Sequence, residues 1–133
     1  MGLLLDTNII STHLKRPGST FSKFNQYSGQ LYTAQIVVAE LYVWCAQAAN
    51  SHGRRMRVDD LLKQVKPIAF DNDCAWKYAE IRVRCGAHDL ADLMIAATAL
   101  VHNHVVVSHD RHFNDIASKV ADLQVVDWLD AMI

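Results

Sequence analysis

Cysteine, long apolar runs and charge of one sign are all scarce in this chain of 133 residues. The three cysteines, Cys45, Cys74 and Cys85, include no Cys-x-x-Cys pair, which argues against a secreted disulfide framework and against a zinc knuckle. No segment approaches the roughly 18 apolar residues of a membrane-spanning helix, and no basic segment precedes the short apolar run at residues 3–5. We therefore predict a cytoplasmic protein with reduced thiols and no membrane contact.

The charge balance gives little indication of a partner. The formal net charge is −1, which by itself points to no polyanion. One basic run, formed by Arg54, Arg55 and Arg57, follows Gly53. These arginines either form the solvated surface of a helix or contact a nucleic acid such as RNA, and the sequence leaves both interpretations open.

The apolar content indicates one domain. Hydrophobic residues make up 51% of the chain, enough to form a core without disulfides or a structural metal. Pro17 and Gly53 are typical of turns, and no repeat or low-complexity segment separates two halves. We predict a single domain over residues 1–133.

Apolar segments of strand and helix length alternate along the chain. The predicted strands cover residues 2–6, 31–34, 67–70, 105–107 and 124–126. The predicted helices cover residues 7–15, 19–27, 35–49, 54–65, 71–85, 90–103 and 128–132, and Asp71 and Asp89 supply N-caps. Continuous apolar strands between helices favour the α/β class, with a parallel sheet covered on both faces.

Four acids stand where an apolar segment should end or turn: Asp6, Glu40, Asp92 and Asp110. Asp6 and Asp110 follow predicted strands, and α/β proteins bind ligands beyond the carboxyl ends of their strands. Asp6 and Asp110 could instead be simple helix N-caps, and Asp92 could serve only to favour a helix dipole.

Glu40 is the hardest of the four to explain locally. On a helix its neighbours three and four residues away are Ile36, Val37, Val43 and Trp44, with no Lys or Arg at pairing distance. An ionised carboxylate on such a face costs several kcal/mol unless a partner compensates it. Tertiary pairing with an arginine is one solution, and a bound metal is the other.

Taken together, the four acids predict a site for a hard divalent cation. Mg²⁺ and Mn²⁺ prefer carboxylate oxygens and retained waters, and they draw on acids from scattered elements. One or two such ions can activate water, polarise a phosphoryl oxygen and stabilise the leaving oxygen during in-line hydrolysis. Phosphodiester cleavage is therefore the chemistry that we expect.

The same residues lie in segments that resemble the successive motifs of PIN-domain ribonucleases. These segments are Leu4-Leu5-Asp6-Thr7-Asn8, Val37-Val38-Ala39-Glu40-Leu41, Asp92-Leu93-Met94-Ile95-Ala96-Ala97 and Val106-Val107-Ser108-His109-Asp110-Arg111-His112-Phe113. They occur in the family's order across nearly the whole chain. The length of the chain further resembles the VapC-type toxins of toxin–antitoxin pairs.

The resemblance implies a three-layer α/β/α fold with a mostly parallel central sheet of four or five strands. It also implies Mg²⁺- or Mn²⁺-dependent RNA cleavage by a type II toxin, a homodimer, and neutralisation by an antitoxin protein. Asp6, Glu40, Asp92 and Asp110 would be the catalytic, metal-binding residues. Thr7, Asn8 and Ser108 would orient them or a water. Asp89 would cap a helix, and it could also tune or join the site.

Other functions are compatible with parts of the sequence. A PIN-like RNA-processing nuclease without a toxin role would use the same acids. A non-enzymatic Mg²⁺-binding signalling module needs a lysine after its last core strand, and Val125-Val126-Asp127-Trp128 supplies none. A haloacid-dehalogenase-like phosphatase needs Asp-x-Asp where this chain has Asp6-Thr7-Asn8. The seven histidines lack the cysteine partners of a closed zinc site, so we assign them no metal.

Overall fold

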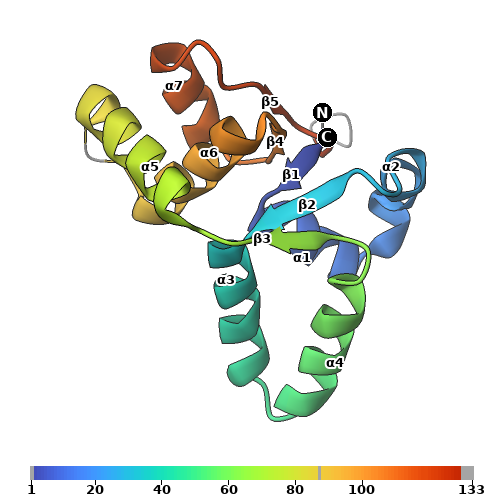
Figure 1. Cartoon of the computed structure of the whole chain (residues 1–133). Helices are drawn as coiled ribbons and strands as arrows, with labels where there is room; N and C mark the ends of the chain where they lie inside the picture. Colours follow the sequence, from blue (N-terminus) through green and yellow to red (C-terminus); the bar gives the residue numbers. More distant parts are fainter. Residues whose placement is uncertain (1, 87, 130–133) are drawn as a thin grey trace.

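The computed structural model describes residues 2–86 and 88–129, and it has the α/β architecture that the alternating segments predict (Figure 1). The strands are β1 (Leu3–Leu5), β2 (Leu31–Ala34), β3 (Lys66–Ile68), β4 (Val105–Val107) and β5 (Val125–Val126). They form one sheet in the order β3-β2-β1-β4-β5, and every pairing is parallel.

Helices cover both faces of this sheet. They are α1 (Thr7–Lys15), α2 (Phe21–Gln26), α3 (Gln35–Ala46), α4 (Ser51–Leu61), α5 (Asn72–Cys85), α6 (Leu90–His102) and α7 (His112–Lys119), with a 3₁₀ turn η1 at Pro17–Ser19. In Figure 1, α5, α6 and α7 gather on one side of the strands, and α1, α3 and α4 on the other. The chain runs outward from β1 through β2 to β3, then crosses back through α5 and α6 to β4 and β5 on the other side of β1, which produces this three-layer arrangement.

The two central strands are the most deeply buried part of the sheet. Leu4 and Leu5 of β1 and Val106 and Val107 of β4 have no exposed surface, because helices pack on both faces. The chain leaves β1 toward β2 on one side and reaches β4 on the other, so the strand order reverses between β1 and β4. This is the position at which open α/β sheets bind ligands.

Most predicted boundaries agree with the structure within a few residues, and the largest difference is at α4. The helix begins at Ser51 rather than at residue 54, because the Asn50 side chain accepts a hydrogen bond from the Gly53 backbone N–H at 3.1 Å and caps it there. Gly53 therefore lies inside the first turn, not in a loop. Helix α4 ends at Leu61 rather than at residue 65. The preceding helix α3 ends at Ala46 instead of residue 49.

Two further differences lie toward the carboxyl end of the chain. Helix α7 was not predicted from the sequence, although it buries Phe113 and Ile116. The helix predicted at 128–132 is not observed at Trp128 and Leu129, which form a bend, and the rest of that range lies outside the described residues. Within residues 2–86 and 88–129, no helix combines the length and apolar composition required to cross a bilayer.

Candidate active site

Asp6 lies directly beyond the carboxyl end of β1 and is buried. Its backbone N–H donates to the Val107 carbonyl at 2.9 Å, which holds it beside β4. Its carboxylate accepts hydrogen bonds from the Thr7 backbone N–H at 2.7 Å and from Ser108 Oγ at 2.8 Å. Asp6 is therefore the N-cap of α1, and its second carboxylate oxygen faces β4.

Burial raises the pKa of Asp6, and the nearby carboxylates of Glu40 and Asp110 add to this effect, while the hydrogen bonds from Ser108 and Thr7 oppose it. The side chain is only 6% exposed. A capping role alone does not require such burial, since N-caps are usually solvated. The position of Asp6 is thus costly for a carboxylate.

Ser108 joins the ends of β1 and β4. Its hydroxyl donates to Asp6 and accepts from the Asp110 backbone N–H at 3.0 Å, so one oxygen contacts both acidic residues. Asn8 supports the same turn, because its Oδ1 accepts from the His109 backbone N–H at 3.2 Å. These contacts are of the kind expected of supporting residues, whose role stays a prediction.

Asp92 lies in the first turn of α6 and is 8% exposed. Asp89 caps this helix, with its carboxylate accepting from the Asp92 backbone N–H at 3.2 Å. Burial raises the pKa of Asp92 to about 7, and the negative charges of Asp110, Asp6 and Asp89 contribute further, whereas His112 lowers it. Asp89 is therefore both a helix cap and one source of the electrostatic strain at Asp92.

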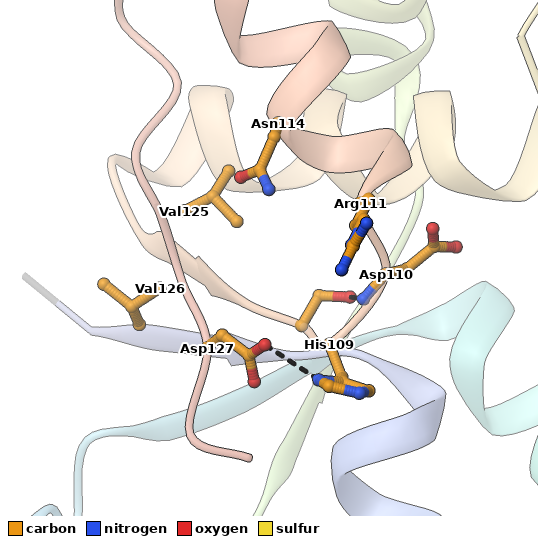
Figure 2. A pocket seen from close by; sticks show the side chains of 8 residues that line it. His109, Asp110, Arg111, Asn114, Val125, Val126 and Asp127 are labelled. Carbon is orange, nitrogen blue, oxygen red and sulfur yellow. Dashed lines mark hydrogen bonds and ion pairs between the residues drawn. The ribbon is translucent and has the colours of Figure 1, made fainter. Parts of the chain in front are cut away.

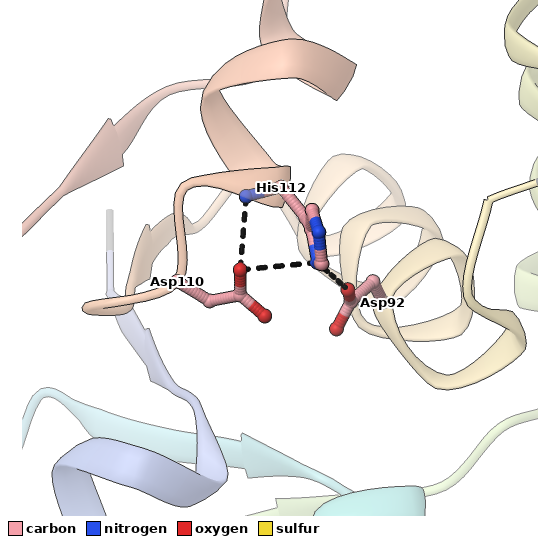
Figure 3. Close-up of side chains that lie close together, drawn as sticks. All are labelled: Asp92, Asp110 and His112. Atoms are coloured by element: carbon pink, nitrogen blue, oxygen red, sulfur yellow. Dashed lines mark hydrogen bonds and ion pairs between the residues drawn. The ribbon is translucent and has the colours of Figure 1, made fainter.

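Asp92, Asp110 and His112 form the most compact group of metal-ligating side chains in the described part of the chain (Figure 3). One ligand atom from each lies within 4.8 Å of the other two. His112 Nδ1 is 3.2 Å from Asp110 Oδ1 and 3.5 Å from Asp92 Oδ2. The Asp110 carboxylate also accepts from the His112 backbone N–H at 2.9 Å, which fixes the turn into α7.

The donor chemistry of this group fits a divalent cation. Two carboxylates suit Mg²⁺ or Mn²⁺, and an imidazole is a better ligand for Mn²⁺ than for Mg²⁺. Among residues 2–86 and 88–129, His112 supplies the only basic nitrogen within 4 Å of the Asp92 carboxylate. The pKa of Asp92 is thus raised because its carboxylate is buried beside other acids without a permanent positive charge.

His112 was missed by the sequence reasoning, which looked for closed zinc sites and assigned the histidines no metal. The available signal was its spacing: His112 follows Asp110 by two residues, at the start of a helix. Because α7 itself was not predicted, the return of this side chain toward Asp110 was not foreseen. The structure places His112 beside the two acids, and metal binding by His112 is a proposal developed below.

The structure also corrects the argument about Glu40. Its side chain is exposed, although it lies among apolar residues in the sequence, and it accepts a hydrogen bond from Thr7 Oγ1 at 2.8 Å. The buried face of α3 consists of Val37, Val38, Leu41 and Cys45, so Glu40 lies away from it. Glu40 carries no large burial cost. It is linked to the site through Thr7 and through its charge, which raises the pKa of Asp6.

The arginines of α4 have intramolecular partners. Arg54 donates to the Trp44 carbonyl at 2.9 Å and stacks 4.3 Å from the centre of the Trp44 ring, and Arg57 donates to the Leu14 carbonyl. Arg55 lies over the Tyr42 ring and pairs with Asp59 at 3.4 Å. These contacts fasten α4 to α3 and α1, and RNA binding by the three arginines stays a prediction.

Comparison with known proteins identifies the family and the fold. A family model described as the PIN domain matches residues 3–119. No curated protein matches the sequence. The fold is similar to the VapBC2 complex of Rickettsia felis bound to a promoter DNA fragment, with 24% identity, TM-score 0.86, and coverage of 96% of this chain and 99% of that one.

Two further structures are similar over nearly their whole length. VapBC-1 of nontypeable Haemophilus influenzae is 25% identical, with TM-score 0.81 and coverage of 98% of this chain and 100% of that one. FitAcB of Neisseria gonorrhoeae is 27% identical, with TM-score 0.78 and coverage of 96% and 99%. Because the family model spans residues 3–119, most of the sequence, this chain belongs to the PIN-domain family.

Proposed function

We propose that this protein is an Mg²⁺- or Mn²⁺-dependent endoribonuclease that hydrolyses RNA phosphodiester bonds with one or two ions, and that it is the toxin of a type II toxin–antitoxin pair. The observation that carries the proposal is the meeting of Asp92 and Asp110 with His112 at the switch point of the sheet. Asp6 lies beside them, and its charge contributes to the raised pKa of Asp92.

Each side chain has a role that follows from its contacts. Asp92, Asp110 and His112 would hold the ion, with Asp6 on the β1 side. Ser108 fixes the position of the Asp6 carboxylate relative to the Asp110 backbone, because its hydroxyl is hydrogen-bonded to both. Thr7 holds Glu40 toward the site. When bound, the ion supplies a Lewis acid that polarises a phosphoryl oxygen and lowers the pKa of water.

Cleavage assays with metal-stripped protein test the enzymatic part. RNA should be cut with Mg²⁺ or Mn²⁺ and left intact with EDTA. Asp6→Asn should lower the rate at least about a hundredfold, because a metal site of this kind contributes several kcal/mol to the transition state. Asp73→Asn, an exposed acid in the first turn of α5, is the matched control and should cleave like the parent. Cleavage in EDTA, or an unaffected Asp6→Asn protein, would refute the proposal.

The toxin role is supported by the similar structures, two of which are named as VapBC assemblies and one as FitAcB. That similarity supports an antitoxin partner. Expression of the parent should stop bacterial growth, Asp6→Asn should not, and co-expression of the neighbouring short open reading frame should restore growth. A protein that cuts RNA in vitro but never inhibits growth would instead be an RNA-processing nuclease.

A homodimer is the expected assembly. Trp76 and Val83 lie seven residues apart on one face of α5 and are 70% and 88% exposed, the largest values among the large apolar side chains of the described residues, which makes them the candidates for an apolar contact between two copies. Light scattering should give twice the mass of the chain. Trp76→Ser with Val83→Ser should give the monomer mass, and a monomeric parent would contradict this part of the proposal.

A further inference from the structure

A cavity adjoins the acidic residues on the far side of the turn that follows β4. None of the roles assigned above uses it. It has a volume of about 630 Å³ and lies between the start of α7 and strand β5 (Figure 2). Pockets that bind small organic groups have volumes of roughly 300–1,000 Å³. Ser108 and Asp110 contribute to its wall, so a polymer held at the acids could extend directly into it.

The walls of this cavity differ in chemistry. Val125 and Val126 form an apolar side, while Arg111 and Asn114 of the α7 end face them across the space (Figure 2). Within the described residues, neither the Arg111 guanidinium nor the Asn114 amide makes a side-chain hydrogen bond or an ion pair. An apolar wall opposite free donors and an amide acceptor suits a flat heterocycle with polar edges.

The remaining wall carries negative charge. His109 Nδ1 is 2.8 Å from Asp127 Oδ2, which orients the imidazole, and the His109 backbone N–H donates to Asn8 Oδ1, which holds the turn after β4. The Asp127 carboxylate, which belongs to no proposed metal site, disfavours a phosphate on this side of the cavity. The ligand that fits is therefore a base and its ribose, with the phosphate kept outside at the metal-ligating acids.

We propose that this cavity binds the nucleoside next to the cleaved phosphodiester, and that Asn114 and Arg111 determine which base is accepted. The proposal rests on the ribonuclease function proposed above. Single-stranded RNA is commonly recognised by bases splayed out of the strand and hydrogen-bonded along their edges. Asn114 can pair with such an edge through one donor and one acceptor.

Sequencing the cut ends of a randomised RNA pool tests the specificity role. The parent should prefer one base at a position adjoining the cut, and Asn114→Asp, which replaces an amide donor with an acceptor, should lower that preference about tenfold. Asn25→Asp, an exposed asparagine on α2 outside the cavity, is the matched control and should keep the parental preference. An unchanged preference in Asn114→Asp would overturn the inference and leave the ribonuclease function intact.

A binding measurement without metal separates this inference from the cleavage chemistry. Isotope-labelled protein in EDTA is titrated with each of the four ribonucleosides at millimolar concentration. The Asn114 side-chain amide and the Val126 methyl signals should shift most with the base preferred in cleavage. If no nucleoside shifts these signals, the cavity does not bind nucleosides, whatever the cleavage assay shows. If they shift but the parent cuts no RNA, the nucleoside site stands and the ribonuclease function fails.

Discussion

Asp92→Asn should make the metal-free protein more stable at neutral and alkaline pH. The folded protein raises the pKa of Asp92 from its ordinary 3.8 to about 7, so the charged carboxylate is disfavoured in the folded state. Near pH 4 and below, Asp92 is protonated in the folded protein and costs nothing. As pH rises toward 7, the unfolded chain loses this proton first, and the free energy of unfolding falls.

The size of the stability gain follows from the difference between the folded and unfolded pKa values of Asp92. Each pH unit corresponds to about 1.4 kcal/mol, so the span from 3.8 to about 7 sets an upper bound of about 4 kcal/mol. Relaxation and water at the edge of the site reduce such costs, and asparagine gives up the interaction of Asp92 with the α6 dipole, worth about 0.3–1 kcal/mol. We expect a net gain of about 2 kcal/mol above pH 7.

Urea unfolding in EDTA, followed by tryptophan fluorescence from about pH 4 to 8, measures this gain. The advantage of Asp92→Asn should be absent at the acidic end and grow until it levels off above pH 7. Asp73→Asn, which also removes a first-turn acid but an exposed one, should change stability by less than about 0.5 kcal/mol at every pH. A gain independent of pH, or none at pH 8, would refute the electrostatic reasoning.

Three further predictions concern the same residues. Millimolar Mn²⁺ should raise the melting temperature of the parent in scanning fluorimetry, because it binds only the folded site, and equal rises in the parent and Asp6→Asn would contradict a shared site. His112→Ala should weaken Mn²⁺ binding about tenfold in calorimetry, while substitution of the exposed His52 by alanine should leave it unchanged. A nitrogen coupling in the spin-echo spectrum of bound Mn²⁺ should disappear only in His112→Ala. Ser108→Ala should destabilise the protein by about 1–2 kcal/mol in urea unfolding, since the buried Asp6 carboxylate loses a donor, and an unchanged midpoint would show that the hydroxyl contributes nothing.

The fold could be predicted from the sequence because local signals and burial agree there. The apolar runs at Leu3–Leu5 and Val105–Val107 are short, continuous and followed by polar residues, which is typical of central parallel strands. Helix α7 lacked such agreement. It has only eight residues, and its N-cap, Arg111, makes no capping side-chain hydrogen bond. The one start signal is Asp110, whose carboxylate accepts from the His112 backbone N–H, and the sequence did not distinguish this capping role from metal binding.

The energetics of the site could not be predicted to the same degree. Apolar neighbours of Glu40 suggested a buried charge, but α3 carries more apolar residues than its contacts with the sheet and α6 require. Val43, for example, is 56% exposed. Local sequence therefore indicates that a helix has a core face without showing which residues occupy it. That choice depends on the packing of elements that are distant in the chain.

The free-energy cost of a buried carboxylate lies at Asp92, where the local sequence indicated a favourable interaction with the helix dipole. Asp92 starts a helix whose next turns are buried against the sheet, so its carboxylate is drawn into the core edge beside Asp6 and Asp110. A proton and a divalent cation are two ways to remove the same unfavourable charge, and they exclude each other at the carboxylate. The stability gained on protonation and part of the affinity for metal therefore have the same source, which is the removal of the unfavourable charge at Asp92. Because the pKa of Asp92 in the metal-free protein is about 7, protons compete with a metal ion for this carboxylate below neutral pH.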